Sequence, residues 1–349
     1  MMRMTPFLAL AVSAVTSLAV VASGNLAAEA VPTAEVTAVT AATKAASTSV
    51  RFATFNVRTA RADRGTSRAW PRRALAVARE IKSRNPGIVA IQELGPGRSD
   101  GKRVSVGNGL RQTTSLEKSL KSVGAGKYQL TRTTAYVKPG ARHGSQGTRI
   151  LYDTSKYRLV SKCRDKTGKS NWNRSCAMVM PMKSGRPSSA AYAEFEDRRT
   201  GRNFFIISAH LDSRHSGSRS KEKVYDNLRA RQASAVYRKV NKLAKGKPVI
   251  FGGDINSWRT KAGRHAPFNY LHSKGFRDST RAPSKIDARY PTINHWKRTL
   301  RPNAPGRQVA LDVIMLNRGK TFRTYENVMK VVDPSRPSDH NMVVSDLVL

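Results

Sequence analysis

Several apolar, strand-like segments of this 349-residue chain end in side chains that can bind a metal ion or move a proton. These side chains are Asn56, Glu93, His210, Asp254, Asn256, Asp339 and His340. A further acid, Asp312, lies inside the apolar segment VALDVIML, where an unpaired charge is costly. Taken singly, such residues more often form turns or helix caps. Their convergence from many strand ends instead predicts a hydrolytic site.

The types of these residues favour a metal-dependent attack of water on phosphorus. Mg²⁺ prefers oxygen ligands and keeps several of its waters, so it is the expected cofactor, with Mn²⁺ or Ca²⁺ as alternatives. Glu93 is the best ligand candidate, with Asn56 and Asp339 near it. Asp254 would align or deprotonate the water, and Asn256 would point to the same face of an extended segment.

The two histidines of the set offer proton transfer or phosphate binding. His340 would hydrogen-bond a non-bridging phosphate oxygen or act as an acid or base, and buried Asp312 would fix its tautomer. His210 would serve as a second acid or base, or as a phosphate-binding group. Neither a Walker-type phosphate loop nor a Gly-x-Ser-x-Gly elbow occurs in the sequence. Residue types alone still leave a Ser/His/Asp triad open.

A regular alternation of strand and helix patterns would position these groups. Residues 70–84 and 223–243 have the apolar spacing of helices, and residues 88–92 and 249–252 are apolar runs suited to buried strands. Further strands are predicted at residues 50–57, 128–137, 148–152, 158–161, 177–182, 190–195, 203–209, 309–316 and 342–349. No repeat or linker divides this stretch, so we predict a single α/β domain with two packed sheets over residues 49–349.

The chain is strongly basic, with 63 Lys and Arg residues against 23 Asp and Glu residues and a net charge of +40. Residues 1–48 hold two basic and two acidic side chains, so the predicted domain carries the whole excess. A hydrophobic content of 39% is too high for a disordered polycation and too interrupted by charge for a polytopic membrane protein. The charge favours polyanions as partners, namely nucleic acid, anionic lipid or an acidic cell-wall polymer.

The N-terminus predicts secretion. A positive charge, the apolar run of residues 7–22 and the small residues that follow make residues 1–30 typical of a secretory signal peptide. Residues 31–48, rich in Ala and Thr, would be a linker or propeptide. In an extracellular protein we expect Cys163 and Cys176 to form a disulfide worth about 3 kcal/mol. No transmembrane segment is expected in the mature chain, and nothing in the sequence implies a stable protein partner, so we expect a monomer.

The motifs, in their order along the chain, resemble those of the endonuclease/exonuclease/phosphatase superfamily. The matching residues are Asn56, Gln92-Glu93, His210-Leu211, Gly253-Asp254-Ile255-Asn256 and Ser338-Asp339-His340. With a histidine at position 210, the chain resembles the deoxyribonuclease I-like and sphingomyelinase-like branch of this superfamily. It looks like a secreted, bacterial-type member of that branch. The resemblance implies an α/β fold, a four-layer α-β-β-α sandwich with two packed central sheets. It also implies a Mg²⁺-dependent phosphodiesterase or phosphatase site at one edge.

The resemblance assigns roles to individual residues. By this resemblance, Asn56 and Glu93 bind the metal, and Asp254 and Asn256 contact the water and the phosphate. Asp312 supports His340. Arg149 begins a strand in the region where nucleases of the family contact phosphate, which makes it a candidate for substrate binding. Deoxyribonuclease-like members also pair their first histidine with a second acid. Residues 95–109 offer only Asp100 for this role, so the acidic partner of His210 stays unidentified.

Three functions are compatible with these observations. The leading one is a secreted nuclease that hydrolyses DNA, with RNA as a further substrate, by metal-assisted attack of water. The second keeps the site but changes the substrate to a phospholipid head group, as in a sphingomyelinase or phospholipase C. The third is a non-catalytic protein that binds polyanions.

Overall fold

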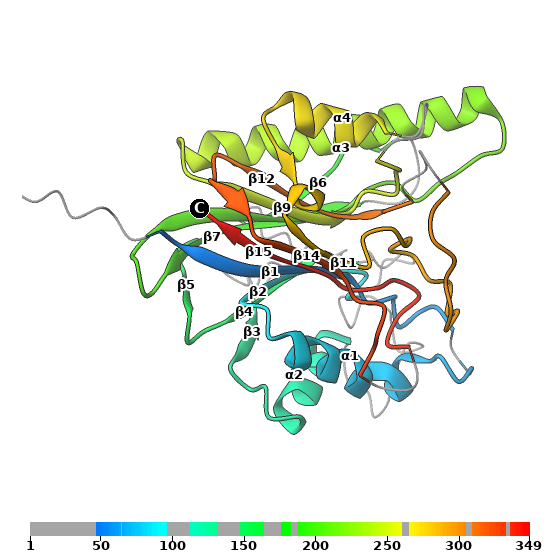
Figure 1. Cartoon of the computed structure of the whole chain (residues 1–349), viewed down its shortest axis with the longest axis horizontal. Helices are drawn as coiled ribbons and strands as arrows, with labels where there is room; N and C mark the ends of the chain where they lie inside the picture. The colour runs from blue at the N-terminus through cyan, green and yellow to red at the C-terminus, as the bar shows by residue number, and fades with distance from the viewer. Residues whose placement is uncertain are drawn as a thin grey trace, which may run out of the picture. The chain divides into compact units, whose positions relative to one another are not determined.

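The computed structural model describes residues 47–63, 65–95, 112–131, 147–163, 176–182, 188–259, 265–304, 309–332 and 336–349. Within these ranges the chain builds two β-sheets that pack face to face, with helices on the outer face of each (Figure 1). Residues 1–46, which include the predicted signal peptide and most of the predicted linker, lie outside the described residues.

The first sheet has the strand order β11-β14-β15-β1-β2-β4-β3, and β13 also pairs with β15. Its strands are β1 (Ser49–Asn56), β2 (Ile88–Gln92), β3 (Tyr128–Leu130), β4 (Arg149–Asp153), β11 (Ser284–Ile286), β13 (Thr321–Phe322), β14 (Thr324–Asn327) and β15 (Val343–Val348). β1 and β2 run parallel, so their carboxyl ends meet at the same edge.

The second sheet has the strand order β10-β12-β9-β8-β7-β5, and β6 also pairs with β7. Its strands are β5 (Tyr157–Leu159), β6 (Ala177–Val179), β7 (Ser189–Asp197), β8 (Asn203–His210), β9 (Val249–Asp254), β10 (Arg277–Asp278) and β12 (Asp312–Asn317). β8 and β9 run parallel, whereas β12 is antiparallel to β9.

Three apolar clusters hold the layers together. The helices are α1 (Trp70–Arg84), α2 (Gln112–Ser122), α3 (Arg219–Ala244) and α4 (Ala266–Ser273), with a 3-10 turn η2 (Ser279–Arg281). One cluster fills the space between the sheets and includes Phe52, Ile206 and Ile250. A second packs α1 and α2 on the first sheet, and a third packs α3 and α4 on the second. The predicted four-layer sandwich is therefore confirmed.

The boundaries of the helices follow from local sequence. α1 begins at Trp70, and Pro71 follows in the first turn, where its fixed φ suits a helix. The helix ends at Arg84, and the capping residue Asn85 takes a left-handed φ of 45°. Both bounds agree with the predicted helix. α3 begins four residues before the predicted helix, at Arg219. α2 was not predicted, because Leu116 and Leu120 are the only large apolar residues in its sequence.

Two consecutive glycines allow β9 to approach its neighbours closely. A Cβ atom on Gly252 would lie 2.6 Å from a ring carbon of Phe52 in the opposite sheet. A Cβ atom on Gly253 would lie 2.4 Å from the carbonyl oxygen of Ala209 in β8. Any larger residue would push β9 away from β8 and from the first sheet. The position of Asp254, the next residue, depends on both glycines.

The remaining sequence predictions concern crosslinks and membranes. Cys163 and Cys176 form a disulfide with Cα atoms 5.5 Å apart, the pairing that the sequence predicted. Of the strand predicted at residues 128–137, the structure describes the first part as β3, and residues 132–146 lie outside the described residues. No helix in the described ranges is long and apolar enough to cross a membrane.

Candidate active site

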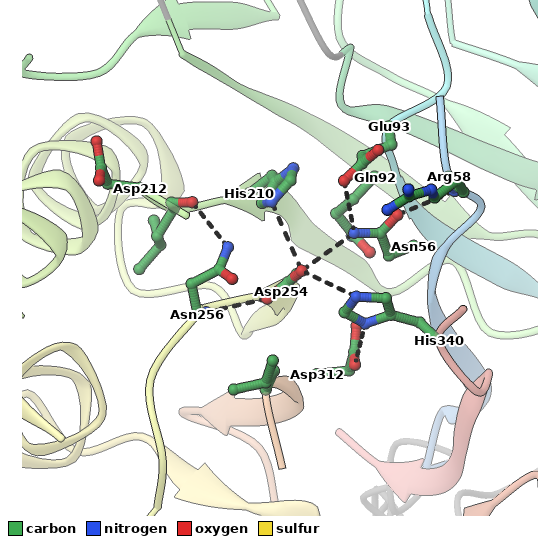
Figure 2. A network of polar contacts seen from close by, with 12 residues as sticks. Asn56, Arg58, Gln92, Glu93, His210, Asp212, Asp254, Asn256, Asp312 and His340 are labelled. Atoms are coloured by element: carbon green, nitrogen blue, oxygen red, sulfur yellow. Dashed lines mark hydrogen bonds and ion pairs between the residues drawn. The ribbon is translucent and has the colours of Figure 1, made fainter. Parts of the chain in front are cut away.

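Strand register brings the candidate residues together at one end of the two sheets. In the first sheet Asn56 of β1 lies opposite Gln92 of β2. In the second sheet His210 of β8 lies opposite Asp254 of β9, and Asp312 of β12 lies opposite the same aspartate. Side chains far apart in sequence therefore point toward one another between the sheets (Figure 2).

The carboxylate of Asp254 is the meeting point of the site (Figure 2). Its Oδ2 atom accepts a hydrogen bond from Nδ2 of Asn56 at 3.1 Å. The same atom lies 3.5 Å from Nε2 of His210 and 3.8 Å from Nε2 of His340. Its Oδ1 atom accepts a hydrogen bond from the backbone N–H of Asn256 at 2.9 Å. Asp254 is only 1% exposed, so these partners define its surroundings, and a carboxylate so placed can orient or deprotonate a water molecule.

Glu93 adds a second carboxylate near Asp254, and the amide nitrogen of Asn56 joins the two. Nδ2 of Asn56 donates to Oε1 of Glu93 at 3.3 Å as well as to Asp254. The backbone N–H of Thr59 donates to Oε2 of Glu93 at 2.9 Å, and that of Arg58 donates to Oδ1 of Asn56 at 3.0 Å. Glu93 has a left-handed φ of 58°, a conformation that is uncommon outside glycine and frequent at functional sites. The turn after β2 thus fixes a partly exposed carboxylate.

Asp312 and His340 form a buried acid–histidine pair. Oδ2 of Asp312 lies 2.9 Å from Nδ1 of His340. Burial by itself would lower the pKa of His340, but the charge and hydrogen bond of Asp312, with the charges of Asp254 and Asp339, raise it to about 10. Burial raises the pKa of Asp312, and contact with His340 opposes this. The imidazole therefore keeps its proton at neutral pH and has two N–H donors.

Asp339 is held at the site by an arginine. Nη1 of Arg58 donates to Oδ2 of Asp339 at 2.7 Å, and its Nε donates to Oδ2 of Asp63 at 2.9 Å. Burial lowers the pKa of Arg58, but the hydrogen bond with Asp63 and the charges of Asp339, Asp63 and Glu93 outweigh burial and raise it above its usual value. The guanidinium therefore stays charged and neutralises Asp339.

Comparison with protein families identifies the group to which this site belongs. A model of the endonuclease/exonuclease/phosphatase family matches residues 53–340, which contain every candidate catalytic and metal-binding residue. The chain belongs to the endonuclease/exonuclease/phosphatase family. Members of this family are metal-dependent phosphoester hydrolases, and this chain is an enzyme of that kind.

Solved structures of the family share the fold at low sequence identity. A family protein from Bacteroides thetaiotaomicron is 20% identical with a TM-score of 0.60, over 87% of this chain and 99% of that one. A mannosyl-6-phosphatase from the same species is 19% identical with a TM-score of 0.58, over 86% and 99% of the two chains. The human Nocturnin catalytic domain, solved with a bound sulfate anion, is 17% identical with a TM-score of 0.55, over 85% and 92%. Among curated proteins, none matches the sequence significantly.

Asn256 does not have the extended conformation that the sequence predicted. The residue follows β9 with a left-handed φ of 48°, so the chain turns sharply after Asp254. Its Nδ2 atom donates to the carbonyl oxygen of Leu211 at 3.0 Å, and its backbone N–H contacts Asp254 (Figure 2). The prediction that both side chains share one face of an extended segment is wrong, because the segment is not extended.

Two other predicted residues have surroundings that sequence did not indicate. Arg149 begins β4 and is 1% exposed, with Nη1 donating to the carbonyl oxygen of Thr148 at 2.8 Å. A polymer could reach this guanidinium only if the surrounding protein moved. His210 lies against Asp254, the carboxylate that also faces His340. Asp100, the other acid considered for His210, lies outside the described residues.

Arg73 of α1 was not predicted to serve the site, yet it joins two of its loops. Its guanidinium donates to the carbonyl oxygens of Arg58 at 2.5 Å and Pro337 at 3.1 Å, and also to that of Val57. The side chain is 2% exposed, and burial lowers its pKa to about 10. Arg73 therefore fixes the turn after β1 against the segment that carries His340. Contacts with carbonyl oxygens leave no motif in a sequence, so nothing indicated this role.

Ser338 and Gln112 add further links between the same loops. Oγ of Ser338 donates to the carbonyl oxygen of Asn56 at 2.7 Å. Oε1 of Gln112, the first residue of α2, accepts from the backbone N–H groups of Ala60 at 3.0 Å and Gly95 at 2.8 Å. The turn after β1 is thus bound to both the turn after β2 and the loop before β15. This network holds the site in one arrangement.

The donor atoms of the site fit the metal dependence of the family. Glu93 and Asp254 offer carboxylate oxygens, which hard divalent cations prefer, and the amide nitrogen of Asn56 joins the two carboxylates. Asp254, Asp312 and His340 also offer ligand atoms within 4.8 Å of one another. In that second group, however, Asp312 and His340 are bound to each other, and imidazole is a ligand more typical of zinc. We therefore favour the oxygen donors around Glu93 as the metal-binding group.

Proposed function

We propose that this phosphoester hydrolase is a secreted, Mg²⁺-dependent nuclease that cleaves DNA, and RNA as well, by attack of water on phosphorus. The observation that carries the proposal is the arrangement around Asp254. It places a carboxylate for the water and a protonated His340 for the phosphate beside the oxygen donors of Glu93. Secretion is proposed from the predicted signal peptide and from the disulfide.

The residues of the chain divide the work of hydrolysis. Glu93 and Asn56 would hold Mg²⁺, which supplies charge stabilisation at the phosphoryl oxygens and lowers the pKa of bound water. Asp254, with His210 beside it, orients the attacking water or accepts its proton. His340 donates from Nε2 to a non-bridging phosphate oxygen, whose negative charge grows in the transition state. Asp312 holds the other ring nitrogen and so keeps the imidazole charged.

Charge favours a nucleic acid over a phospholipid as substrate. Neutralisation of phosphates supplies most of the non-specific affinity for nucleic acid, and this chain carries a net charge of +40. An enzyme that acts on lipid would expose an apolar patch near the site. Among the described residues the most exposed large apolar side chains are Ile286 at 54% and Val332 at 51%, and neither is aromatic. Trp296 is partly buried and lies 5.3 Å from the guanidinium of Arg68, which disfavours insertion into lipid.

The experiment that tests the proposal compares three substrates with one protein. Supercoiled plasmid, RNA and sphingomyelin vesicles are each incubated with the wild type and Asp254→Ala, with Mg²⁺ and with chelator. We expect nicking of plasmid that needs Mg²⁺ and disappears in Asp254→Ala. An Asp346→Ala variant is the matched control, because Asp346 lies on β15 and pairs with Arg51 outside the site.

Three results would contradict the proposal. Full nicking by Asp254→Ala would remove the assigned role of that carboxylate. Release of phosphocholine as fast as, or faster than, cleavage of plasmid would favour a lipid phosphodiesterase. Binding of DNA by the wild type without turnover of any substrate would favour the non-catalytic polyanion binder.

A further inference from the structure

Residues 294–298 form a loop that is bound directly to the backbone of the site. The backbone N–H groups of Asn294 and His295 both donate to the carbonyl oxygen of Asp339, at 2.7 and 3.1 Å. Nδ2 of Asn294 also donates to the carbonyl oxygen of Ser338 at 3.1 Å. The start of the loop is therefore fixed next to the residue that precedes His340.

A buried arginine fixes the other end of this loop. Nε of Arg336 donates to the carbonyl oxygen of Lys297 at 2.5 Å, and its Nη2 donates to that of Arg298 at 3.0 Å. Nη1 donates to Oδ1 of Asn341 at 3.0 Å, just beyond the acid–histidine pair. Arg336 is 8% exposed. Because its guanidinium binds neutral oxygens, it orders the loop without neutralising a carboxylate there.

The loop is held in a conformation that its own residues do not favour. His295 and Trp296 have left-handed φ values of 50° and 65°, which cost of order 1–3 kcal/mol each for residues other than glycine. Such conformations persist when surrounding contacts impose them, and they cluster at functional sites. The ring of Trp296 lies 5.3 and 5.8 Å from the guanidinium groups of Arg68 and Arg73, so it faces the protein.

The charged side chains of the loop remain available to a ligand. His295, Lys297 and Arg298 are exposed. Within the part of the chain that the structure describes, no ion pair involves Lys297 or Arg298. Their backbones are fixed, so fewer degrees of freedom are lost when a ligand binds than for cations on a mobile segment. Two exposed cations on a loop whose backbone is bound to the site suit a second negative group near the reacting phosphorus.

We propose that His295, Lys297 and Arg298 bind the phosphate backbone of a nucleic acid next to the scissile phosphodiester. The inference rests on the proposed function and adds to it the subsite that distinguishes a polymer from a small phosphodiester. A polymer offers neighbouring phosphates to the loop, whereas a small phosphodiester offers only the reacting one. The loop therefore raises affinity for the polymer and leaves the chemistry of the bond unchanged.

The test combines the Lys297→Ala/Arg298→Ala double variant with a matched control. The control is Arg238→Ala/Lys242→Ala on α3, which removes the same charge from exposed residues away from the loop. Each protein is assayed with Mg²⁺ on a duplex oligonucleotide, on sphingomyelin vesicles and on bis(p-nitrophenyl) phosphate at several salt concentrations. Dissociation constants for the oligonucleotide are measured in the Asp254→Ala background, where cleavage is not expected. Thermal unfolding shows whether each variant is folded.

We expect the loop variant to raise KM for the oligonucleotide about tenfold with little change in kcat. The slope of log affinity against log salt should fall by about 2, because roughly 0.9 counterion is released for each phosphate contact in duplex DNA. Hydrolysis of bis(p-nitrophenyl) phosphate should not change. The α3 control should show a smaller effect on KM for the oligonucleotide.

Each alternative gives a different result. An equal loss in the α3 control would show that net charge, and not the loop, sets affinity. An equal loss of activity on bis(p-nitrophenyl) phosphate would show that the loop only supports the structure of the site. A loss confined to sphingomyelin vesicles would assign the loop to a lipid surface. If the wild type hydrolyses the small phosphodiester but not DNA, the proposed function fails. If the wild type cleaves DNA and the loop variant binds DNA with unchanged affinity, only the proposal for the loop is overturned.

Discussion

The Asp312→Asn substitution tests the buried acid–histidine pair with almost no change in side-chain size. In the wild type, Oδ2 of Asp312 lies 2.9 Å from Nδ1 of His340, and Asp312 is 0% exposed. Asparagine keeps an oxygen that can accept this hydrogen bond but removes the negative charge. The pKa of His340, raised to about 10 in the wild type, should therefore fall toward its usual 6.5.

The size of the effect follows from the kind of hydrogen bond that is weakened. A hydrogen bond to a charged group contributes about 1.5–3 kcal/mol, compared with about 1 kcal/mol for a neutral one. The charge-dependent part is therefore about 0.5–2 kcal/mol. If it acts in the transition state, where His340 binds the phosphate, kcat/KM should fall about 2- to 30-fold, at 1.36 kcal/mol for each factor of ten. Asp254 and Asp339 keep their charges, so part of the stabilisation of the imidazolium remains.

The assay measures kcat/KM on a small phosphodiester with saturating Mg²⁺, and NMR titration of the histidine signals follows the pKa of His340. Asp346→Asn is the matched control, because Asp346 pairs with Arg51 on β1, outside the site. We expect the control to keep wild-type activity. A folded Asp312→Asn enzyme with wild-type kcat/KM, or with an unchanged pKa at His340, would refute the assignment of Asp312 as the group that keeps the imidazole charged.

Three further predictions concern stability. In Arg73→Lys, the lysine cannot make the three contacts with carbonyl oxygens that the arginine makes. The free energy of unfolding measured by urea titration should fall by about 1–3 kcal/mol, and kcat/KM should also fall. Unchanged values of both would contradict the role of Arg73 in linking the two loops. Cys163→Ser opens the disulfide and should lower the free energy of unfolding by about 3 kcal/mol with kcat/KM unchanged, and an unaltered urea midpoint would contradict this. The pKa of His340 is raised from 6.5 to about 10 on folding, so its stabilising contribution should be complete below pH 6.5 and lost as pH rises through 10. Urea titrations across this range should show the loss in the wild type and not in His340→Gln.

The layers of the fold could be predicted because the apolar patterns are strong where the core is formed. Residues 70–84 and 88–92 were predicted with the bounds that the structure gives, since a proline, an asparagine and a glycine mark the ends. The pairing of the strands could not be predicted, because no local pattern shows which strands are neighbours. Short strands such as β13 and β14 were missed for the same reason: their residues become strands only by pairing with β15.

The chemistry of the site was easier to predict than its geometry. Acids and histidines at strand ends indicated hydrolysis because few other roles need so many such groups. The left-handed turn at Asn256 was missed, since asparagine also occurs in extended segments. Arg58, Arg73 and Arg336 were missed because arginine at a surface-like position has the same sequence signature whether it is solvated or binds carbonyl oxygens.

Arginines that are bound to other groups of the protein also change how the net charge should be interpreted. Arg73 and Arg336 bind carbonyl oxygens, Arg58 neutralises Asp339, and Arg229 of α3 pairs with Glu222 at 2.8 Å. Because these guanidinium groups already have partners within the protein, we expect them to contribute little to contacts with a polymer. The salt dependence of DNA affinity should therefore correspond to the few phosphates that fixed, exposed cations can reach, and not to the net charge of +40. A slope that follows net charge in a series of surface variants, irrespective of position, would show that the polymer is bound by the field of the whole protein and not by a built subsite.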